Sequence, residues 1–211
     1  MVIIGAGLLG KTLAKSWTDA KCVAIEGVLN RSLASSETAI QFIGQGHAYT
    51  DLAELPDTDI YAIFTGDDQI VSTCEALAAA IDLKGKIVFH ASGILPASVL
   101  NTAKQAGAYI ASVHPCTSFA DPARVAERFA GTLCAVEGDE AALAKLIPLF
   151  EAIGADICPI NPEQKAAYHA ACVIAGNYPT TLKYLSMQAF KQAGLDTTHA
   201  NQLAQQLMEG V

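Results

Sequence analysis

The chain of 211 residues is long enough for one medium-sized α/β domain and part of a second. Hydrophobic residues make up 52% of it and charged residues 16%, which excludes extended disorder and supplies ample material for a core. The net charge of −8 comes without a basic patch, so we expect no nucleic-acid partner.

Membrane and secretory signals are missing from the sequence. No apolar run reaches the roughly 18 to 20 residues that span a bilayer. The first apolar run has no basic segment before it and soon reaches glycine, unlike a signal peptide. We therefore expect a cytoplasmic protein with no membrane partner. The six cysteines are scattered without a C-x-x-C pair, so we expect no metal site. Most of them lie inside apolar runs, so we expect these to be buried thiols, in a reducing compartment.

Most of the chain alternates short apolar runs with helical patterns. The strands predicted in this way are residues 1–4, 22–29, 47–50, 59–64, 86–90, 109–113, 132–136 and 156–158. Helices are predicted between them, over residues 10–18, 36–43 and 140–153 among others. This alternation predicts the α/β class with a doubly wound, mostly parallel sheet.

The pattern changes at Pro162. Alanine, leucine and glutamine dominate from there, and two helices fit, one over residues 163–193 and one from Thr197 to the end. Pro179 should kink or restart the first of them. We therefore predict a dinucleotide-binding domain over residues 1–160 and a short all-helical C-terminal domain over 161–211. The chain ends without a helix-stopping segment, so this second domain could be truncated.

A glycine-rich turn follows the first predicted strand. Gly5-Ala6-Gly7-Leu8-Leu9-Gly10 matches G-x-G-x-x-G, and it lies between a strand and a helix, the context in which the motif binds a dinucleotide. The first glycine permits the tight turn, the second lets the pyrophosphate approach, and the third lets the helix pack on the strand. Free amides at the helix start, including those of Leu8 and Leu9, would face the phosphates. The motif predicts a Rossmann fold; the alternative is a glycine-rich turn without a ligand.

The end of the second predicted strand decides the choice of cofactor. NAD-binding proteins place a carboxylate there, about 20 residues after the glycines, whereas this chain has Asn30-Arg31-Ser32. A guanidinium and a hydroxyl suit a 2′-phosphate, so we expect NADP. Glu26 is the competing residue, because a strand that ends early would make it a ribose ligand and the cofactor NAD.

Several further segments, with this turn, carry a resemblance to a known family. The segments are Asn30-Arg31-Ser32, residues 65–70, residues 90–93, residues 114–121, residues 168–171 and Asn177-Tyr178. With them the chain resembles Rossmann-like NADP-binding proteins that carry a C-terminal domain of unknown function. These are related to the deazaflavin-dependent NADP oxidoreductases, ketopantoate reductase and the 6-phosphogluconate dehydrogenase group. The resemblance implies NADP and a reductase reaction, and it names no substrate.

Ligands of a doubly wound sheet lie beyond the carboxyl ends of its strands. Loops after the later strands bring Thr65, Gly66 and Ser92 there as cofactor contacts and His114 as a catalytic candidate. For His114, a core histidine bonded to backbone is an equal alternative.

His169 and Asn177 are the other two catalytic candidates. A histidine inside an apolar helical segment is costly to bury without a partner, and eight residues bring Asn177 to an adjoining part of the same helix face. Related dehydrogenases supply a proton donor, often lysine, and an asparagine from this helix. His169 can donate a proton near neutral pH. The alternative is a helix-packing surface.

The sequence thus predicts an NADP-dependent oxidoreductase that acts on a small carbonyl or imine substrate at a cleft between the domains. The alternative function is a non-catalytic NADP-binding sensor or partner protein. Apolar residues of the C-terminal helices, together with the relatives, predict a homodimer formed through this region.

Overall fold

The computed structural model describes residues 1–210. The chain divides into two compact units, one comprising Met1–Lys165 and the other beginning at Ala166. The sequence places the boundary five residues earlier, before the 3-10 turn that precedes the long C-terminal helix. We describe each unit by itself.

The first unit is built on one mostly parallel sheet. Over the described residues it has eight strands in the order β3-β2-β1-β4-β5-β6-β7-β8, and only the β6–β7 pair is antiparallel. The strands are β1 (Val2–Ile4), β2 (Gly27–Leu29), β3 (His47–Tyr49), β4 (Ile60–Ile63), β5 (Ile87–His90), β6 (Tyr109–Pro115), β7 (Leu133–Gly138) and β8 (Asp156–Pro159). This confirms the predicted doubly wound α/β fold with helices in its C-terminal part.

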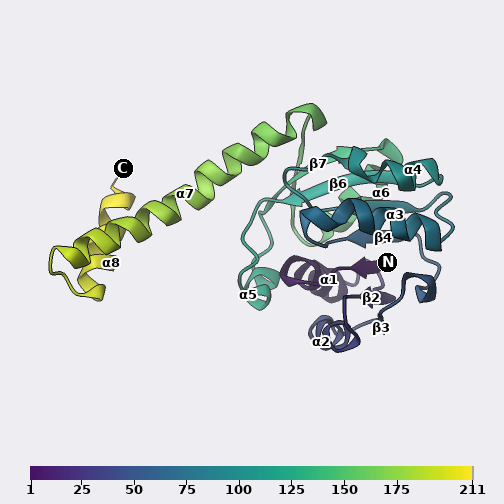
Figure 1. Cartoon of the computed structure of the whole chain (residues 1–211), viewed down its shortest axis with the longest axis horizontal. Coiled ribbons are helices and arrows are strands. Elements are labelled where there is room, and N and C mark those ends of the chain that lie inside the picture. Colours follow the sequence, from purple (N-terminus) through teal and green to yellow (C-terminus); the bar gives the residue numbers. More distant parts are fainter. Residues whose placement is uncertain (211) are drawn as a thin grey trace. The chain divides into compact units, whose positions relative to one another are not determined.

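Helices cover both faces of this sheet (Figure 1). They are α1 (Leu8–Ala20), α2 (Leu33–Ile43), α3 (Ile70–Ala80), α4 (Asn101–Gln105), α5 (Pro122–Glu127) and α6 (Glu140–Ala152), with the short 3-10 helices η1 (Leu52–Glu54), η2 (Asp67–Gln69), η3 (Ala97–Leu100) and η4 (Pro162–Gln164). Apolar residues of α1, α2 and α6 form the core on one face, and those of α3, α4 and η3 form the core on the other. Burial on both faces explains why the strands are continuous apolar runs.

An aromatic cluster fixes α1 against the sheet. Trp17 is fully buried, and its ring meets Phe150 of α6 edge to face, with centroids 5.2 Å apart. Its indole N–H donates to the carbonyl of Leu149 at 3.1 Å. Phe64 and Phe89 continue the cluster, with centroids 5.4 Å apart. The helix that follows the glycine turn is therefore held in place by core packing.

The second unit holds most of α7 (Lys165–Gln192) and all of α8 (Thr197–Glu209). The sequence predicts that Pro179 kinks or restarts the helix. It does not restart it, because α7 is one uninterrupted helix that contains Pro179 (Figure 1). Proline removes one backbone donor, and the remaining hydrogen bonds of a 28-residue helix carry it past the gap. Asp196 caps α8 by accepting from the His199 amide at 2.9 Å. Within residues 1–210, no helix is both long and apolar enough to cross a bilayer.

Two predicted strands have different lengths in the structure. The strand predicted over residues 22–29 is reduced to Gly27–Leu29, since β1, its neighbour, has only three residues to pair with. The strand predicted over 109–113 extends to Pro115, because β7 pairs with it as far as Cys134. His114 therefore lies inside β6 and not in the loop after it.

Candidate functional site

The glycine turn between β1 and α1 requires glycine at its first position. Gly5 has a φ of +93°, and a Cβ there would stand 2.7 Å from the carbonyl carbon of Phe64 and from the amide nitrogen of Thr65. Its amide donates to the carbonyl of Leu29 at 2.8 Å. The turn thus passes directly between the ends of β2 and β4.

The second and third glycines of the turn differ in whether packing requires a residue without a side chain. A Cβ on Gly10 would stand 2.6 Å from the carbonyl oxygen of Gly5, so the third glycine lets α1 pack against the turn. A Cβ on Gly7 would have nothing within 4 Å. The protein's own packing does not require glycine there, whereas a phosphate approaching the backbone would.

The amino end of α1 is open to an anion. The amide of Lys11 makes the first hydrogen bond of the helix, to the carbonyl of Gly7 at 3.0 Å. The preceding amides, of Leu8, Leu9 and Gly10, therefore come before any intrahelical partner, and Gly7 supplies no side-chain cap. Such a helix end, with its partial positive charge, suits a phosphate.

Asn30 joins the end of β2 to the glycine turn. Its Oδ1 accepts from the amide of Ala6 at 2.8 Å, and its own amide donates to Ser36 Oγ at 2.9 Å. Its Nδ2 is buried and has no hydrogen-bond partner among the described residues. Asn30 therefore shapes the turn and keeps one donor for a ligand.

Arg31 and Ser32 follow at the surface. The Arg31 side chain is exposed. Ser32 caps α2 by accepting from the amide of Ser35 at 3.3 Å. Its hydroxyl hydrogen stays available to an acceptor such as a phosphate oxygen.

Glu26 lies at the wrong end of β2 to bind a ribose. It precedes Gly27, whereas Asn30 follows Leu29 at the carboxyl end. Its carboxylate accepts from the amino terminus at 2.8 Å and from Thr58 Oγ1 at 2.7 Å. The alternative in which Glu26 grips the ribose of NAD is therefore not supported.

Thr65 and Gly66 follow β4 beside the turn. Thr65 Oγ1 is buried and, among the described residues, has no hydrogen-bond partner. Gly66 is exposed and precedes η2, where its carbonyl accepts from the Gln69 amide at 2.8 Å. The unpaired groups of Thr65 and Asn30 are the kind of buried donor that a bound ligand satisfies.

A row of polar side chains crosses the three neighbouring strands β5, β6 and β7, level with the carboxyl end of β5. His90 on β5 pairs with Ser112 on β6, and Ser112 pairs with Glu137 on β7. All three side chains are buried, and residues in register on adjacent strands point to the same face. The sequence analysis did not identify Ser112 and Glu137 as members of this row.

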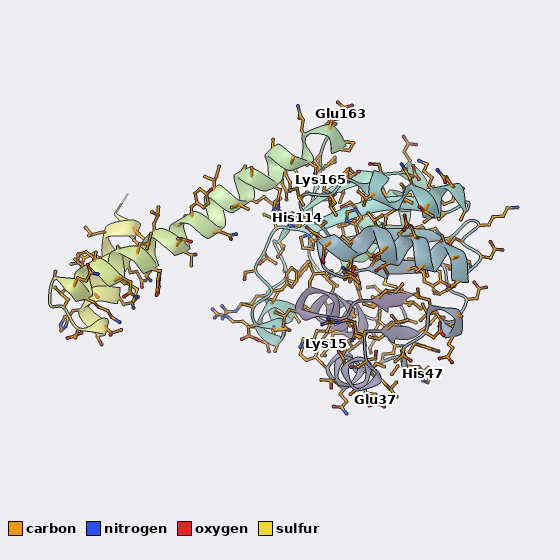
Figure 2. All side chains as sticks on the ribbon, in the orientation of Figure 1. Lys15, Glu37, His47, His114, Glu163 and Lys165 are labelled. Carbon is orange, nitrogen blue, oxygen red and sulfur yellow. The ribbon has the colours of Figure 1, made fainter. Side chains whose placement is uncertain are left out.

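Lys165, the first residue of α7, is labelled in Figure 2. It binds two residues of this row. Its Nζ donates to Ser112 Oγ and lies 3.0 Å from Glu137 Oε1. The side chain of Lys165 is 1% exposed and that of Glu137 is 5% exposed. Burial lowers the pKa of Lys165 from the usual lysine range, and the carboxylates of Glu137 and Asp67 oppose that decrease.

His90 is held as a neutral imidazole. Its Nδ1 accepts from the amide of Ser92 at 3.1 Å, so Nε2 carries the proton and donates to the carbonyl of Pro96 at 3.2 Å. Burial, and then the nearby Lys165 ammonium, lowers the pKa of His90 to about 4. Ser92 Oγ in turn accepts from the amides of Ile94 and Leu95 at 3.3 and 3.1 Å. The Ser92 hydroxyl thus shapes the loop after β5, and its contact with a cofactor stays a prediction.

The remaining candidates lie on two elements. His114 is half-buried, two residues after Ser112 on β6 and therefore on the same face of the sheet. His169 and Asn177 lie on α7, where His169 is half-buried and Asn177 is exposed. Their catalytic roles stay predictions.

A signal for the missed residues was present in the sequence. Glu137 is the one charged residue of Leu133–Gly138, and Ser112 interrupts an apolar run. A buried carboxylate needs a cation, and Lys165 follows 28 residues later. The register that joins them depends on the antiparallel β6–β7 pair, which the periodicity of the chain does not reveal.

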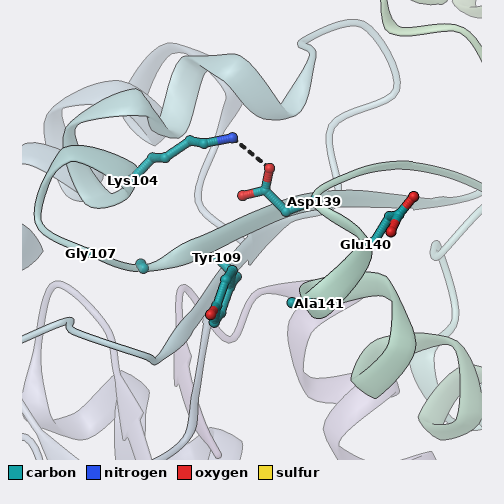
Figure 3. Close-up of a pocket in the computed structure, with 7 residues that line it drawn as sticks. Lys104, Gly107, Tyr109, Asp139, Glu140 and Ala141 are labelled. Atoms are coloured by element: carbon teal, nitrogen blue, oxygen red, sulfur yellow. Dashed lines mark hydrogen bonds and ion pairs between the residues drawn. The ribbon is translucent and has the colours of Figure 1, made fainter.

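A hollow lies at the opposite end of the sheet from the glycine turn. It is lined by residues of α4, β6 and α6, including Tyr109, and Lys104 Nζ pairs there with Asp139 Oδ1 at 2.5 Å (Figure 3). Tyr109 begins β6, so this hollow is at the amino ends of the parallel strands. Among the described residues, no group of three or more His, Cys, Asp or Glu side chains is placed to hold a metal ion.

The strand order and the glycine turn define a Rossmann-type α/β protein, in which a dinucleotide binds beyond the carboxyl ends of the strands. Comparison with known proteins agrees with this class. Residues 132–211 match the family described as a domain of unknown function, DUF2520. No curated protein matches this chain by sequence.

Solved structures with the same fold cover nearly the whole chain. Protein TM1727 from Thermotoga maritima is 27% identical, with a TM-score of 0.73 over 99% of this chain and 75% of its own. Pyrroline carboxylate reductase from Plasmodium falciparum, solved with NADP bound, is 16% identical, with a TM-score of 0.68 over 99% and 75%. Prephenate dehydrogenase from Aquifex aeolicus, solved with hydroxyphenyl propionate and NAD+, is 13% identical, with a TM-score of 0.73 over 96% and 77%. These likenesses establish the Rossmann-like fold.

Proposed function

We propose that the chain is an NADP-dependent oxidoreductase that reduces a small carbonyl or imine compound. The observation that carries this proposal is the glycine turn. A Cβ on Gly7 would meet nothing within 4 Å, and no side chain caps the first amides of α1. Among the described residues, the buried Nδ2 of Asn30 and Oγ1 of Thr65 have no hydrogen-bond partner. All of these features suit the pyrophosphate and ribose of a dinucleotide. The solved relatives named for reductase and dehydrogenase reactions support the same class.

NADP is favoured over NAD by the end of β2. Asn30 and Ser32 are neutral, and Arg31 is an exposed cation. The carboxylate of Glu26, at the other end of the strand, is bonded to the amino terminus and to Thr58. A 2′-phosphate gains charge-assisted hydrogen bonds from a guanidinium. A ribose diol would find no carboxylate at this strand end.

The reaction needs a hydride and a proton. When bound, the reduced nicotinamide supplies the hydride, and a protein group has to supply the proton to the substrate oxygen or nitrogen. His169 is the donor expected from the sequence, with Asn177 and His114 as orienting groups. The buried Lys165 ammonium is a further cation in the first unit, bonded to Ser112 in the middle of β6, which pairs with the carboxyl end of β5.

Replacing Arg31 by Ala tests the cofactor assignment. We expect NADPH binding to weaken by about 1.5 to 3 kcal/mol, the range for a hydrogen bond to a charged group, which is roughly a 10- to 150-fold increase in Kd. NADH binding should stay nearly unchanged, because NADH has no 2′-phosphate. Calorimetric titration of both cofactors measures this difference.

Lys145→Ala, which removes an exposed cation from α6, is the matched control and should alter neither affinity. Equal losses of NADPH and NADH binding in the Arg31 variant would contradict the 2′-phosphate assignment. Loss of nicotinamide absorbance with a panel of small ketones and cyclic imines then tests turnover.

A further inference from the structure

The pair of Lys165 and Glu137 is unusual for its burial. Both side chains are at least 95% buried, and their charged atoms are 3.0 Å apart. Removing two charges from water costs several kcal/mol for each, and well-packed apolar residues of similar volume are often as stable or more stable. Stability alone therefore does not account for this pair.

The pair lies at the end of the sheet that carries the glycine turn. The register row that contains His90, Ser112 and Glu137 continues through Ile63 on β4 to Ile4 on β1. The residue after Ile4 is Gly5. In a Rossmann fold the cofactor runs from the glycine turn across the carboxyl ends of the neighbouring strands. The pair is thus several strands from the pyrophosphate, on the side where the nicotinamide belongs.

Each element around the ammonium contributes a group. Glu137 faces it from β7, Ser112 from β6, His90 from β5 and Asp67 from η2. His90 is neutral through its two backbone bonds, so it adds no second cation.

The Glu137 carboxylate is itself fixed from behind. Its Oε1 accepts from the amide of Ala97, at the start of η3, at 2.7 Å. One oxygen therefore binds both the backbone and the Lys165 ammonium. With its carboxylate anchored in this way, Glu137 sets the position of the cation.

We propose that Glu137 is a positioning residue that holds Lys165 as an ammonium ion on the side of the sheet where the nicotinamide of the proposed cofactor would lie. This inference rests on the proposed function. The ammonium acts through its charge: hydride transfer to a carbonyl leaves negative charge developing on the substrate oxygen, and a fixed cation in a dry site stabilises it. Ser112 fixes the ammonium from a second side.

The test follows the Nζ signal of Lys165 by NMR in protein labelled with 15N-lysine, with Lys165→Arg to assign the signal. In the wild-type chain, NADP+ should shift this signal, and adenosine 2′,5′-bisphosphate, which lacks the nicotinamide half of the cofactor, should not. This comparison needs no variant at Glu137, so it holds even if such a variant fails to fold.

Glu137→Gln tests the positioning role. Glutamine keeps the size and an oxygen for the Ala97 amide but removes the charge. The midpoint at which Lys165 loses its proton should fall by roughly one pH unit or more, a tenfold weaker hold on the proton. Asp139→Asn, which breaks the more exposed pair with Lys104 at the other end of the sheet, is the control and should leave the midpoint unchanged.

The outcomes separate the two proposals. If calorimetry shows that NADP+ binds but the Lys165 Nζ signal does not shift, this inference is wrong. The proposed cofactor site is then unaffected. An unchanged midpoint in Glu137→Gln overturns the positioning role. Absence of NADP+ binding by the folded wild-type chain overturns the proposed function itself.

Discussion

The imidazole of His90 shows how strongly the fold acts on a single residue. Its pKa falls to about 4, because burial penalises the charged ring and the Lys165 ammonium adds to that penalty. Both ring nitrogens are satisfied in the neutral form. Protonating the ring would break the bond that Nδ1 accepts from Ser92.

This makes stability depend on acidity. Because the pKa of His90 is lower in the folded state than in the unfolded chain, the unfolded chain binds more protons between pH 4 and 6.5. The free energy of unfolding should therefore fall by about 2 to 3 kcal/mol between pH 7 and 4.5. Denaturant titrations at several pH values measure this.

His90→Asn is the comparison for that dependence. Its amide oxygen can still accept from the Ser92 amide, so the variant should fold, with lower stability at pH 7 and a flatter profile over the same window. A wild-type profile that is flat, or a variant as acid-sensitive as the wild type, would contradict the account of His90.

Single residues also mark where sequence reasoning stops. The positions of Asn30, Arg31 and Ser32 follow from counting beyond the glycines, and the structure puts all three after β2. The bond from the Ala6 amide to Asn30 Oδ1 could not be predicted in this way, because it depends on how two loops meet. The same limit hid Glu137 and Ser112, the partners of Lys165, which are 28 and 53 residues away from it.

At the scale of elements, the glycine turn separates packing from ligand binding. Gly10→Ala should destabilise the chain, because its Cβ would stand 2.6 Å from backbone oxygen. Gly7→Ala should keep the wild-type melting temperature to within a few degrees, since its Cβ meets nothing within 4 Å, yet lose most NADPH binding. Thermal unfolding and calorimetry of both variants test the pair. A Gly7→Ala chain that binds NADPH as the wild type does would argue that the turn is no phosphate site.

Element types were easier to predict than element ends. Alternating apolar runs and helical periods identified the strands of the sheet, because each parallel strand is buried on both faces. The ends depended on neighbours: β2 is short because β1 is short, and β6 is long because β7 pairs with it. The effect of Pro179 also depended on its surroundings, because a long helix tolerates the loss of one hydrogen bond.

At the scale of the whole molecule, exposed apolar residues of the second unit indicate self-association. Ile174, Tyr178, Leu182 and Leu185 are each more than half exposed and recur along α7 at helical spacing. We propose a homodimer formed through the C-terminal helices. Light scattering at micromolar concentration should report twice the mass of the chain, and a double change of Leu182 and Leu185 to Glu should shift it toward the monomer. A wild-type chain that is monomeric under these conditions would argue against the dimer.

The central claim is that the first unit binds NADP at the glycine turn and carries a charged pair at the nicotinamide end. A crystal structure of the chain with NADP+ tests it most directly. We predict the pyrophosphate on the amides of Leu8, Leu9 and Gly10, the 2′-phosphate against Arg31, and the nicotinamide beyond the carboxyl ends of β4 and β5. A cofactor bound elsewhere on the chain, or a turn left empty at saturating NADP+, would contradict the account.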